Sequence, residues 1–194
     1  LPVFEDEKGS YILNAKDLCM LEHIDKLAEA GVSSLKIEGR AKSAYYVASV
    51  TSAYRGALDA YRSDPAHYAA PEWAKQEVCK VSHRAYSTGF YFGRPDQYGK
   101  DSGYIRTWDI IGVVENWENG MLELSERNPF SQGDMAEAML PGREPVPLEI
   151  KTMLDPEVGE VERACHPMRR YFIPYAHPLP QGTMIRKQTS EKFD

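Results

Sequence analysis

Apolar residues recur at helical spacing along two segments in the first third of the chain. The first stripe is Leu18, Leu21, Ile24, Leu27 and Ala28, and the second is Tyr46, Val47, Val50, Tyr54, Leu58 and Tyr61. Gly31 follows the first stripe where a left-handed C-cap is expected, and Ser43 precedes the second where its hydroxyl can cap a helix N-terminus. The pattern therefore predicts two helices joined by residues 32–42.

A short strand is predicted before the first helix. Tyr11–Leu13 is an apolar run, and Asn14 with Asp17 three residues later resembles a capping box in which Asp replaces the usual Glu. The first helix should therefore begin at Asn14, which would place Cys19 in its first turn. There the positive end of the helix dipole favours the thiolate form of a cysteine.

Residues 33–40, between the two helices, alternate as a strand does. Leu35 and Ile37 share one face, while the charged residues Lys36, Glu38 and Arg40 share the other. The order strand, helix, strand, helix is typical of parallel strands joined by crossover helices, because a parallel pair cannot be closed by a tight turn.

The charged face of this predicted strand is the candidate catalytic site. In a parallel barrel, strands deliver charged groups to the mouth at their C-terminal ends. Glu38 could act as acid, base or substrate anchor there, Arg40 could bind a substrate carboxylate through its two nitrogens, and Lys36 would pair with a carboxylate inside the barrel. The alternative is a buried ion-pair network that only joins this strand to its neighbours.

In the last ninety residues, the apolar positions change from helical spacing to the alternation that is typical of strands. β-type runs occupy residues 110–115, 121–125, 135–140, 146–153, 158–165 and 183–187, and Asn119-Gly120 between the first two is a strong hairpin signal. Six short strands with Gly and Pro turns predict a small closed β-barrel over 104–194. Residues 93–103 contain Pro95 and Gly99 and are predicted to be the linker from an α/β unit over 1–92.

Several of these segments together resemble the collagenase-like peptidase family U32. The matching residues are Tyr11–Cys19 (YILNAKDLC), Ala30–Arg40 (AGVSSLKIEGR), Lys42-Ser43, Tyr45–Val47 and Ala53–Arg55, with a weaker match over His83–Tyr91. The resemblance covers most of residues 10–61 nearly without gaps. It implies the C-terminal strand-helix units of a TIM-like barrel, followed by the small β-barrel domain that many relatives carry.

The resemblance implies two activities for the parent protein. Family members are named as peptidases, some of them collagenases, yet several relatives hydroxylate without oxygen, among them enzymes that form 5-hydroxyuridine in tRNA from prephenate. In the hydroxylases an iron-sulfur cluster held by cysteines is implicated, and Cys19 would be one ligand. The leading expectation is tRNA modification by prephenate-dependent hydroxylation, with tRNA as partner. Proteolysis of a polypeptide, or a non-catalytic binding module, are the alternatives.

The chain is too short to contain the whole of such a catalytic domain. It has 194 residues and supplies about two strand-helix units, whereas a closed barrel needs eight in roughly 250 residues. It also begins at Leu1 without an initiator Met. We therefore expect a piece of a longer enzyme, which packs against the remainder of its own catalytic domain and is inactive in isolation.

The overall charge gives no signal for nucleic acid. Lys and Arg number 23 against 29 Asp and Glu, a net charge of −6. A local exception is the C-terminal basic group, which comprises Arg163, Arg169, Arg170, Arg186 and Lys187. These side chains could contact phosphates, or they could form an ordinary solvated sheet face.

Cysteine and histidine spacing excludes a complete metal site. Cys19, Cys79 and Cys165 are widely spaced, and the five histidines form no pair at metal-ligand spacing, so no metal and no cofactor are expected in these residues alone. An iron-sulfur cluster remains expected in the full-length parent. Cys19 could instead be a small buried apolar residue. Three cysteines without a disulfide pattern, no leader and no membrane-spanning run favour a cytoplasmic protein.

Overall fold

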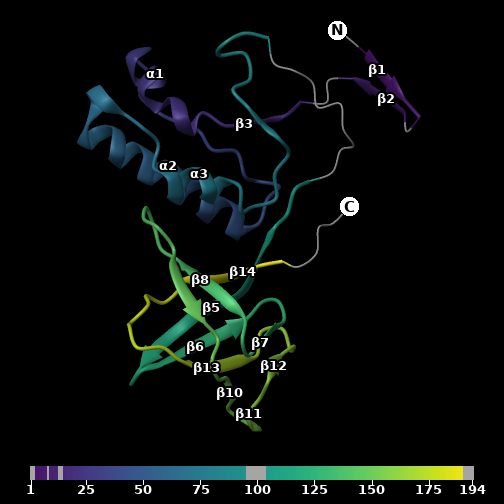
Figure 1. Cartoon of the computed structure of the whole chain (residues 1–194), viewed down its shortest axis with the longest axis vertical. Helices are drawn as coiled ribbons and strands as arrows, with labels where there is room; N and C mark the ends of the chain where they lie inside the picture. Colours follow the sequence, from purple (N-terminus) through teal and green to yellow (C-terminus); the bar gives the residue numbers. More distant parts are fainter. Residues whose placement is uncertain (1–2, 8, 13–14, 95–103, 190–194) are drawn as a thin grey trace.

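The computed structural model describes residues 3–7, 9–12, 15–94 and 104–189, and it places a helical part beside a β part (Figure 1). The helical part contains the 3-10 helix η1 (Leu21–His23), α1 (Ile24–Glu29), α2 (Ala44–Ser63), η2 (Pro65–His67) and α3 (Glu72–Val78). A two-stranded antiparallel hairpin, β1 (Val3–Asp6) with β2 (Gly9–Ile12), lies to one side. Among the described residues, no helix combines the length and the apolar character needed to cross a bilayer.

Both predicted helix boundaries that depend on local capping are confirmed. Gly31 has φ of +80°, and its amide donates to the carbonyl of Ala28 while the Val32 amide donates to that of Leu27, which ends α1. At the start of α2, the Ser43 hydroxyl accepts a hydrogen bond from the Tyr46 amide at 3.2 Å. These ends form where predicted because the groups that satisfy them are only three or four residues away.

The predicted helix start at Asn14 is wrong within the described residues. Asp17 does not cap a helix but lies in strand β3 (Asp17–Leu18), which pairs in parallel with β4 (Tyr86–Ser87). Its carboxylate accepts a hydrogen bond from the Arg84 amide at 2.9 Å. Asp17 thus finds its hydrogen-bond partner in a distant segment and not in the first turn of a helix. The helical residues begin only at Leu21. Asn14 itself is outside the described residues.

Residues 33–40 form no strand in the structure, so that prediction is also wrong. No backbone pairing is assigned from Val32 to Gly39, although the expected alternation persists: Leu35 and Ile37 are half-buried, and Lys36 is exposed. The strand-helix units of a parallel barrel are therefore not seen. Among the described residues, parallel pairing is limited to β3 with β4, where each strand has two residues.

The helical part is held together by a small apolar core between α2 and α3. The core comprises Leu21, Ile24, Ala53, Ala57, Ala74 and Val78. Tyr54 and Tyr61 pack against it, as their place on the helical stripe predicts, whereas Val47 on the same stripe is 41% exposed. Gly56 lies where Trp73 of α3 crosses α2, and no Cβ could fit between them. Small residues on α2 therefore set how closely the two helices approach.

The β part is one eight-stranded antiparallel sheet with a short two-stranded addition. Its strands are β5 (Trp108–Glu118), β6 (Met121–Glu126), β8 (Met135–Met139), β9 (Val146–Glu149), β10 (Leu154–Asp155), β11 (Gly159–Glu160), β13 (Arg170–Pro174) and β14 (Met184–Gln188). The hydrogen-bonded order is β11-β10-β13-β6-β5-β14-β8-β9, and β7 (Phe130–Ser131) pairs with β12 (Arg163–Ala164). The central place of β13 was not predicted.

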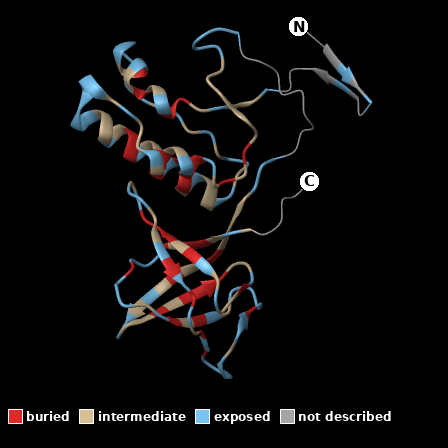
Figure 2. Cartoon of the chain, in the orientation of Figure 1, coloured by how far each residue is buried: buried red, intermediate tan, exposed pale blue. Residues whose placement is uncertain are grey.

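The predicted hairpin between β5 and β6 is confirmed. Asn119 and Gly120 both have positive φ, +51° and +78°, as a type I′ turn requires, and Glu118 faces Met121 across the ladder. The curved sheet encloses the main apolar core of the protein, visible as buried residues in Figure 2. The antiparallel β domain is thus confirmed. Within the described residues, no pairing between β11 and β9 joins the two ends of the sheet.

Candidate functional site

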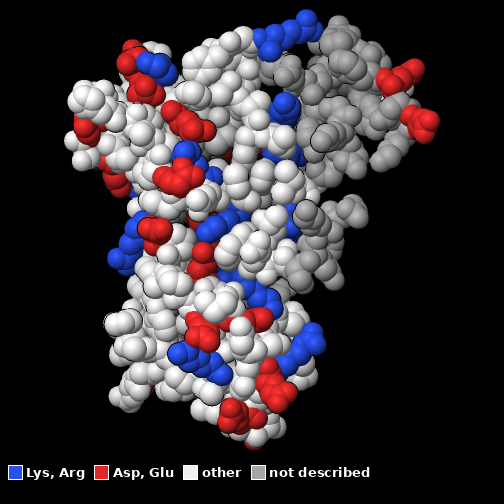
Figure 3. Space-filling model, viewed as in Figure 1, with Lys and Arg blue, Asp and Glu red and all other residues white. Residues whose placement is uncertain are grey.

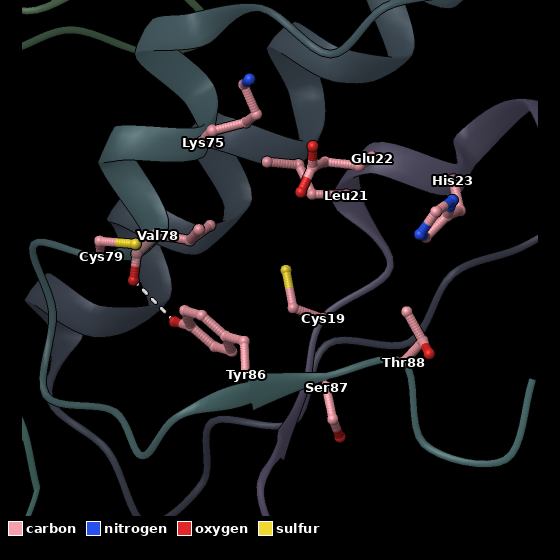
Figure 4. A pocket seen from close by; sticks show the side chains of 10 residues that line it. All are labelled: Cys19, Leu21, Glu22, His23, Lys75, Val78, Cys79, Tyr86, Ser87 and Thr88. Carbon is pink, nitrogen blue, oxygen red and sulfur yellow. Dashed lines mark hydrogen bonds between the residues drawn. The ribbon is translucent and has the colours of Figure 1, made fainter. Parts of the chain in front are cut away.

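A cavity of about 280 Å³ opens where β3, η1, α3 and β4 meet (Figure 4). Its walls are Cys19, Leu21, Glu22, His23, Lys75, Val78, Cys79, Tyr86, Ser87 and Thr88. In Figure 4 the Cys19 side chain projects into the space between Tyr86 and η1. The cavity therefore brings a predicted cofactor ligand together with residues of α3 and β4, which the sequence did not connect with it.

Cys19 is held by backbone pairing and not by a helix turn. Its amide donates to the Ser87 carbonyl at 2.9 Å, which continues the β3–β4 ladder by one residue. The Tyr54 hydroxyl lies 3.9 Å from the Cys19 sulfur and accepts a hydrogen bond from the Met20 amide at 2.9 Å. The expected effect of a helix dipole on this thiol is therefore absent, because Cys19 lies outside the first turn of any described helix.

Burial favours the neutral form of two groups in the cavity wall, Cys79 and Tyr86. Partial burial of the Cys79 side chain, with a smaller contribution from Cys19, raises the pKa of the Cys79 thiol. Burial also raises the pKa of Tyr86, whose hydroxyl donates to the Val78 carbonyl at 2.6 Å. The cavity wall thus combines two thiols and a phenol with the ionisable side chains of Glu22, His23 and Lys75.

The described residues do not make a complete cluster site. No group of three or more His, Cys, Asp or Glu side chains in this part of the chain is arranged to hold a metal. Cys19 and Cys79 line one cavity, but Cys165 lies in the β part, after β12. An iron-sulfur cluster needs about four thiolate ligands, so the two cysteines of this cavity cannot supply all of them.

The three predicted catalytic residues are exposed to solvent. The Glu38 and Arg40 side chains are 67% and 92% exposed, and 3.9 Å separates Glu38 Oε1 from Arg40 Nε. Glu38 also accepts a hydrogen bond from the Arg40 amide. Lys36 is exposed as well. The structure thus brings Glu38 and Arg40 together locally, but it does not place the three side chains inside a barrel or in the Cys19 cavity.

A second cavity, of about 440 Å³, lies at the junction of the helical and β parts, and we call it the junction cavity. It is lined by Ala41, Lys42, Ser43, Tyr45, Tyr46, Val81, Ser82, Tyr104, Arg106, Trp108 and Asp109. The Lys42 ammonium lies 4.2 Å from the ring centre of Tyr104 and 5.2 Å from that of Tyr46. A lysine ammonium and two tyrosine rings therefore lie together in its wall.

A fully buried arginine lies beside this junction cavity. Arg186 of β14 has no exposed surface and forms a two-nitrogen ion pair with Glu77 of α3. It also donates to the hydroxyls of Tyr45 and Ser49 on α2 and pairs with Glu137 of β8. Burial is the largest single influence and opposes its charge, yet the hydrogen bond that it donates to Glu77 and the nearby charges of Glu77 and Glu137 together outweigh burial and raise the pKa of Arg186.

The C-terminal basic group does not form one exposed cationic patch. Arg186 is buried, Lys187 pairs with Asp134 at 2.6 Å, and Arg170 pairs with Glu123 at 2.6 Å. Figure 3 shows basic and acidic side chains mixed over the face in view. The basic residues, adjacent in sequence, separate because alternate strand residues point to opposite faces of the sheet.

The sequence reasoning missed the junction cavity altogether. Tyr46 was assigned to the helix core, and Lys42, Tyr104 and Trp108 carried no motif. These residues come from segments more than fifty positions apart, so no local spacing connects them. The one available signal was the aromatic residues on both sides of the predicted linker.

Family models match both parts of the chain. The model described as peptidase family U32 matches residues 3–101, and the model described as the peptidase family U32 C-terminal domain matches residues 106–186. The solved structure of the C-terminal domain of a Geobacillus thermoleovorans protein, described as a U32 peptidase, is 27% identical; it covers 41% of this chain and 99% of that chain, with a TM-score of 0.38.

Curated relatives carry two kinds of name. "tRNA hydroxylation protein P1" of Bacillus subtilis is 33% identical over 190 residues, which cover 95% of this chain and 45% of that protein. "Uncharacterized protease MJ0090" of Methanocaldococcus jannaschii is 51% identical, and the match covers 44% of this chain and 20% of that protein. "Collagenase" of Porphyromonas gingivalis is 34% identical, and the match covers 46% of this chain and 22% of that protein. This chain spans less than half of the length of these relatives. On these matches, the chain belongs to peptidase family U32.

Proposed function

We propose that this chain is part of an enzyme that hydroxylates tRNA, and that the reaction forms 5-hydroxyuridine with prephenate as the co-substrate. The observation that carries the proposal is the match to the tRNA hydroxylation protein of B. subtilis, because it extends over 95% of the chain and includes both the helical and the β part. The relatives with protease names match less than half of the chain.

The exposed charged segment supplies the proposed substrate contacts. Lys36, Glu38 and Arg40 project from a segment without strand pairing, so their side chains are free to meet the remainder of a longer catalytic domain or its substrate. Arg40 is suited to bind a carboxylate such as those of prephenate, because its guanidinium presents parallel N–H groups. Glu38 would take or deliver a proton at the reacting base.

Cys19 is the proposed cluster ligand of this chain. Its sulfur faces a cavity, and a thiolate is the usual protein ligand of iron in iron-sulfur clusters. The remaining ligands would come from outside the described residues. Replacement by Ser in a chain of the length of the relatives should lower the iron and acid-labile sulfide content, which can be measured without any activity assay.

Mass spectrometry of tRNA nucleosides tests the proposed activity. A host strain that lacks its own tRNA hydroxylation protein is complemented with a chain of the relatives' full length that carries this sequence. We expect 5-hydroxyuridine and its derivatives to return, and to disappear again when prephenate synthesis is blocked. Arg40→Gln should lower the modified fraction about tenfold or more, since it removes a charge-assisted hydrogen bond to the co-substrate.

The matched control is Lys26→Gln, which removes an exposed cation on α1 that pairs with Glu29. It should leave the modified fraction unchanged. Wild-type complementation without any hydroxyuridine would contradict the proposal. Retained modification in the Arg40 variant would contradict only the role given to this residue.

A peptidase is the second candidate, favoured by the relatives named "Collagenase" and protease. Cys19 and His23 share one cavity, as a thiol and its base would, but the polar contact recorded for the Cys19 sulfur is with the Tyr54 hydroxyl. Gelatin cleavage by the longer protein that is lost on Cys19→Ala and His23→Ala, together with unchanged tRNA, would favour this candidate.

A further inference from the structure

The junction cavity has the chemistry of a nucleotide-binding site. We propose that it binds one unpaired nucleotide of the tRNA, with the base on the exposed ring of Tyr104 and the adjoining phosphate on Lys42. This inference rests on the proposed function for the identity of the RNA, and it adds a docking site that shares no lining residue with the Cys19 cavity. Three observations support it: the contacts of Lys42, the aromatic rings in the cavity wall, and the hydrogen bonds that hold these rings in place.

The Lys42 ammonium is available to a ligand. Its ammonium donates to the Ser82 carbonyl at 3.2 Å, a neutral acceptor, and in the described part of the chain no carboxylate pairs with it. Stacking between Tyr46 and Tyr104 fixes its position without neutralising it. A phosphate oxygen is the complementary partner for such a point charge.

The charges around Lys42 favour an anion over a cation. Arg106 lines the same cavity and pairs with Asp109, so these two side chains together are neutral. The first turn of α2, which opens on the cavity at Ser43, carries no acidic residue. Together with the charge of Lys42, the wall is therefore net positive, although the whole chain carries −6.

Aromatic faces supply the second half of the recognition. Tyr104 is 46% exposed and contributes a ring at the cavity rim, while Tyr46 and Trp108 are half-buried in the wall. Base-aromatic stacking with a cation beside it is how proteins bind unpaired nucleotides without reading their sequence. Paired bases cannot stack in this way, because their faces are covered by their neighbours in the helix.

Hydrogen bonds and a cation–aromatic contact hold Tyr45 and Trp108 of the junction cavity in place. The Tyr45 hydroxyl donates to the Lys80 carbonyl at 3.1 Å and accepts from Arg186, and the Lys80 ammonium lies 4.6 Å from the ring centre of Trp108. These contacts join α2, the segment after α3, β5 and β14, so the aromatic side chains need little reordering when a ligand arrives. Preorganisation of this kind lowers the entropic cost of binding.

Fluorescence anisotropy on the 194-residue chain tests the proposal. The probes are a fluorescein-labelled tRNA anticodon stem-loop and a fully paired RNA duplex of the same length. We expect the stem-loop to bind more tightly. Tyr104→Ala should weaken its binding about tenfold, as expected for the loss of one stacked base, and Tyr104→Phe should retain it. Lys42→Gln should reduce the slope of log affinity against log salt by about 0.7, the value for one phosphate on a single strand.

Matched controls lie outside the junction cavity. Tyr91→Ala removes another exposed tyrosine and Lys151→Gln another exposed lysine, and neither should change the affinity or the salt slope. Circular dichroism checks that each variant is folded. Equal affinity of the Tyr104→Ala variant and the wild type would overturn the proposal, as would equal affinity for the stem-loop and the duplex. Displacement of the RNA by gelatin at the Tyr104 site would indicate a polypeptide site instead.

The outcome can be separated from that of the proposed function. Loss of RNA binding in the Tyr104→Ala variant, in a protein that forms no hydroxyuridine in cells, would support the docking site and contradict the reaction. Normal hydroxylation by a full-length Tyr104→Ala variant with unchanged affinity for tRNA would support the reaction and contradict the docking site.

Discussion

At the scale of single residues, burial changes what a charged side chain can do. Glu126 at the end of β6 is fully buried, and one of its oxygens accepts the His166 amide at 2.7 Å while the other has no partner among the described residues. Burial raises the pKa of this carboxyl, and the hydrogen bond from His166 offsets only part of the effect. The folded state therefore binds a proton here more readily than the unfolded chain does.

This raised pKa predicts a pH-dependent loss of stability. The protonated form is favoured by folding, so the contribution of Glu126 is fully present below the unfolded pKa and is lost as the pH rises through the higher folded pKa. Glu126→Gln should therefore raise the unfolding free energy by roughly 1 kcal/mol at pH 8, and the gain should vanish near pH 4. Thermal unfolding across this range measures it.

The exposed Glu144→Gln provides the control for the Glu126 experiment. It removes one carboxylate from the surface and should leave the pH profile of stability as in the wild type. A constant difference between the Glu126→Gln variant and the wild type from pH 4 to pH 8 would contradict the assignment.

At the scale of elements, helix contacts depend on one glycine. Gly56 on α2 faces the Trp73 ring of α3, and an added Cβ would overlap the ring. Glycine in a helix interior costs about 1 kcal/mol relative to alanine, so this position favours close packing over helix propensity. Small residues of α2 such as Ala53 and Ala57 make the contact with α3, and the larger apolar residues of the predicted stripe are therefore only partly buried.

Gly56→Ala should therefore destabilise the protein although it improves helix propensity. We expect a net loss of about 1–2 kcal/mol in the free energy of unfolding, because overpacking outweighs the propensity gain. Trp73→Leu should cost stability by itself but should relieve the clash, so the two substitutions together should cost less than their sum. Urea unfolding measures this coupling.

Thr51→Ala is the matched control on the exposed side of α2. It should change stability by no more than about 0.5 kcal/mol, in the stabilising direction. Additive effects of the Gly56 and Trp73 substitutions would show that the two side chains do not meet as described.

At the scale of the whole molecule, the two parts of the chain are joined by polar contacts in a buried interface. Arg186 connects the sheet to α2 and α3, and the Ser52 hydroxyl of α2 donates to the Leu140 carbonyl at 3.2 Å and accepts the Gly142 amide at 2.9 Å. Burial raises the pKa of Tyr45 in this interface to about 12. The two parts therefore present one continuous surface around the junction cavity.

Arg186→Met should be among the most damaging substitutions, with a loss of about 3–5 kcal/mol, because Glu77 would be left buried without its partner. Replacing Glu77 by Leu in the same chain should restore much of this loss, since no uncompensated charge then remains. Denaturant unfolding followed by tryptophan fluorescence and circular dichroism checks both variants.

The control is Arg170→Met, which breaks an exposed ion pair with Glu123 and should cost less than about 1 kcal/mol. Similar losses for the Arg186 and Arg170 variants would contradict the structural role of the buried pair.

Features that depend on near neighbours follow from the amino-acid sequence alone. The caps at Gly31 and Ser43, the Asn119-Gly120 turn and the change from helical to strand spacing were all predictable, because their partners lie within a few residues. The family could also be recognised from the sequence, because the resemblance lies in contiguous motifs within residues 10–61.

Strand pairing and the burial of charged side chains depend instead on contacts between distant segments. Asp17 joins a strand because Tyr86 is beside it, residues 33–40 find no strand partner among the described residues, and Arg186 is buried because Glu77, 109 positions away, neutralises it. The junction cavity arises in the same way, from Lys42 and Tyr104. Such contacts depend on which distant segments meet. That is determined by the free energy of the whole fold, which no local pattern of residues contains.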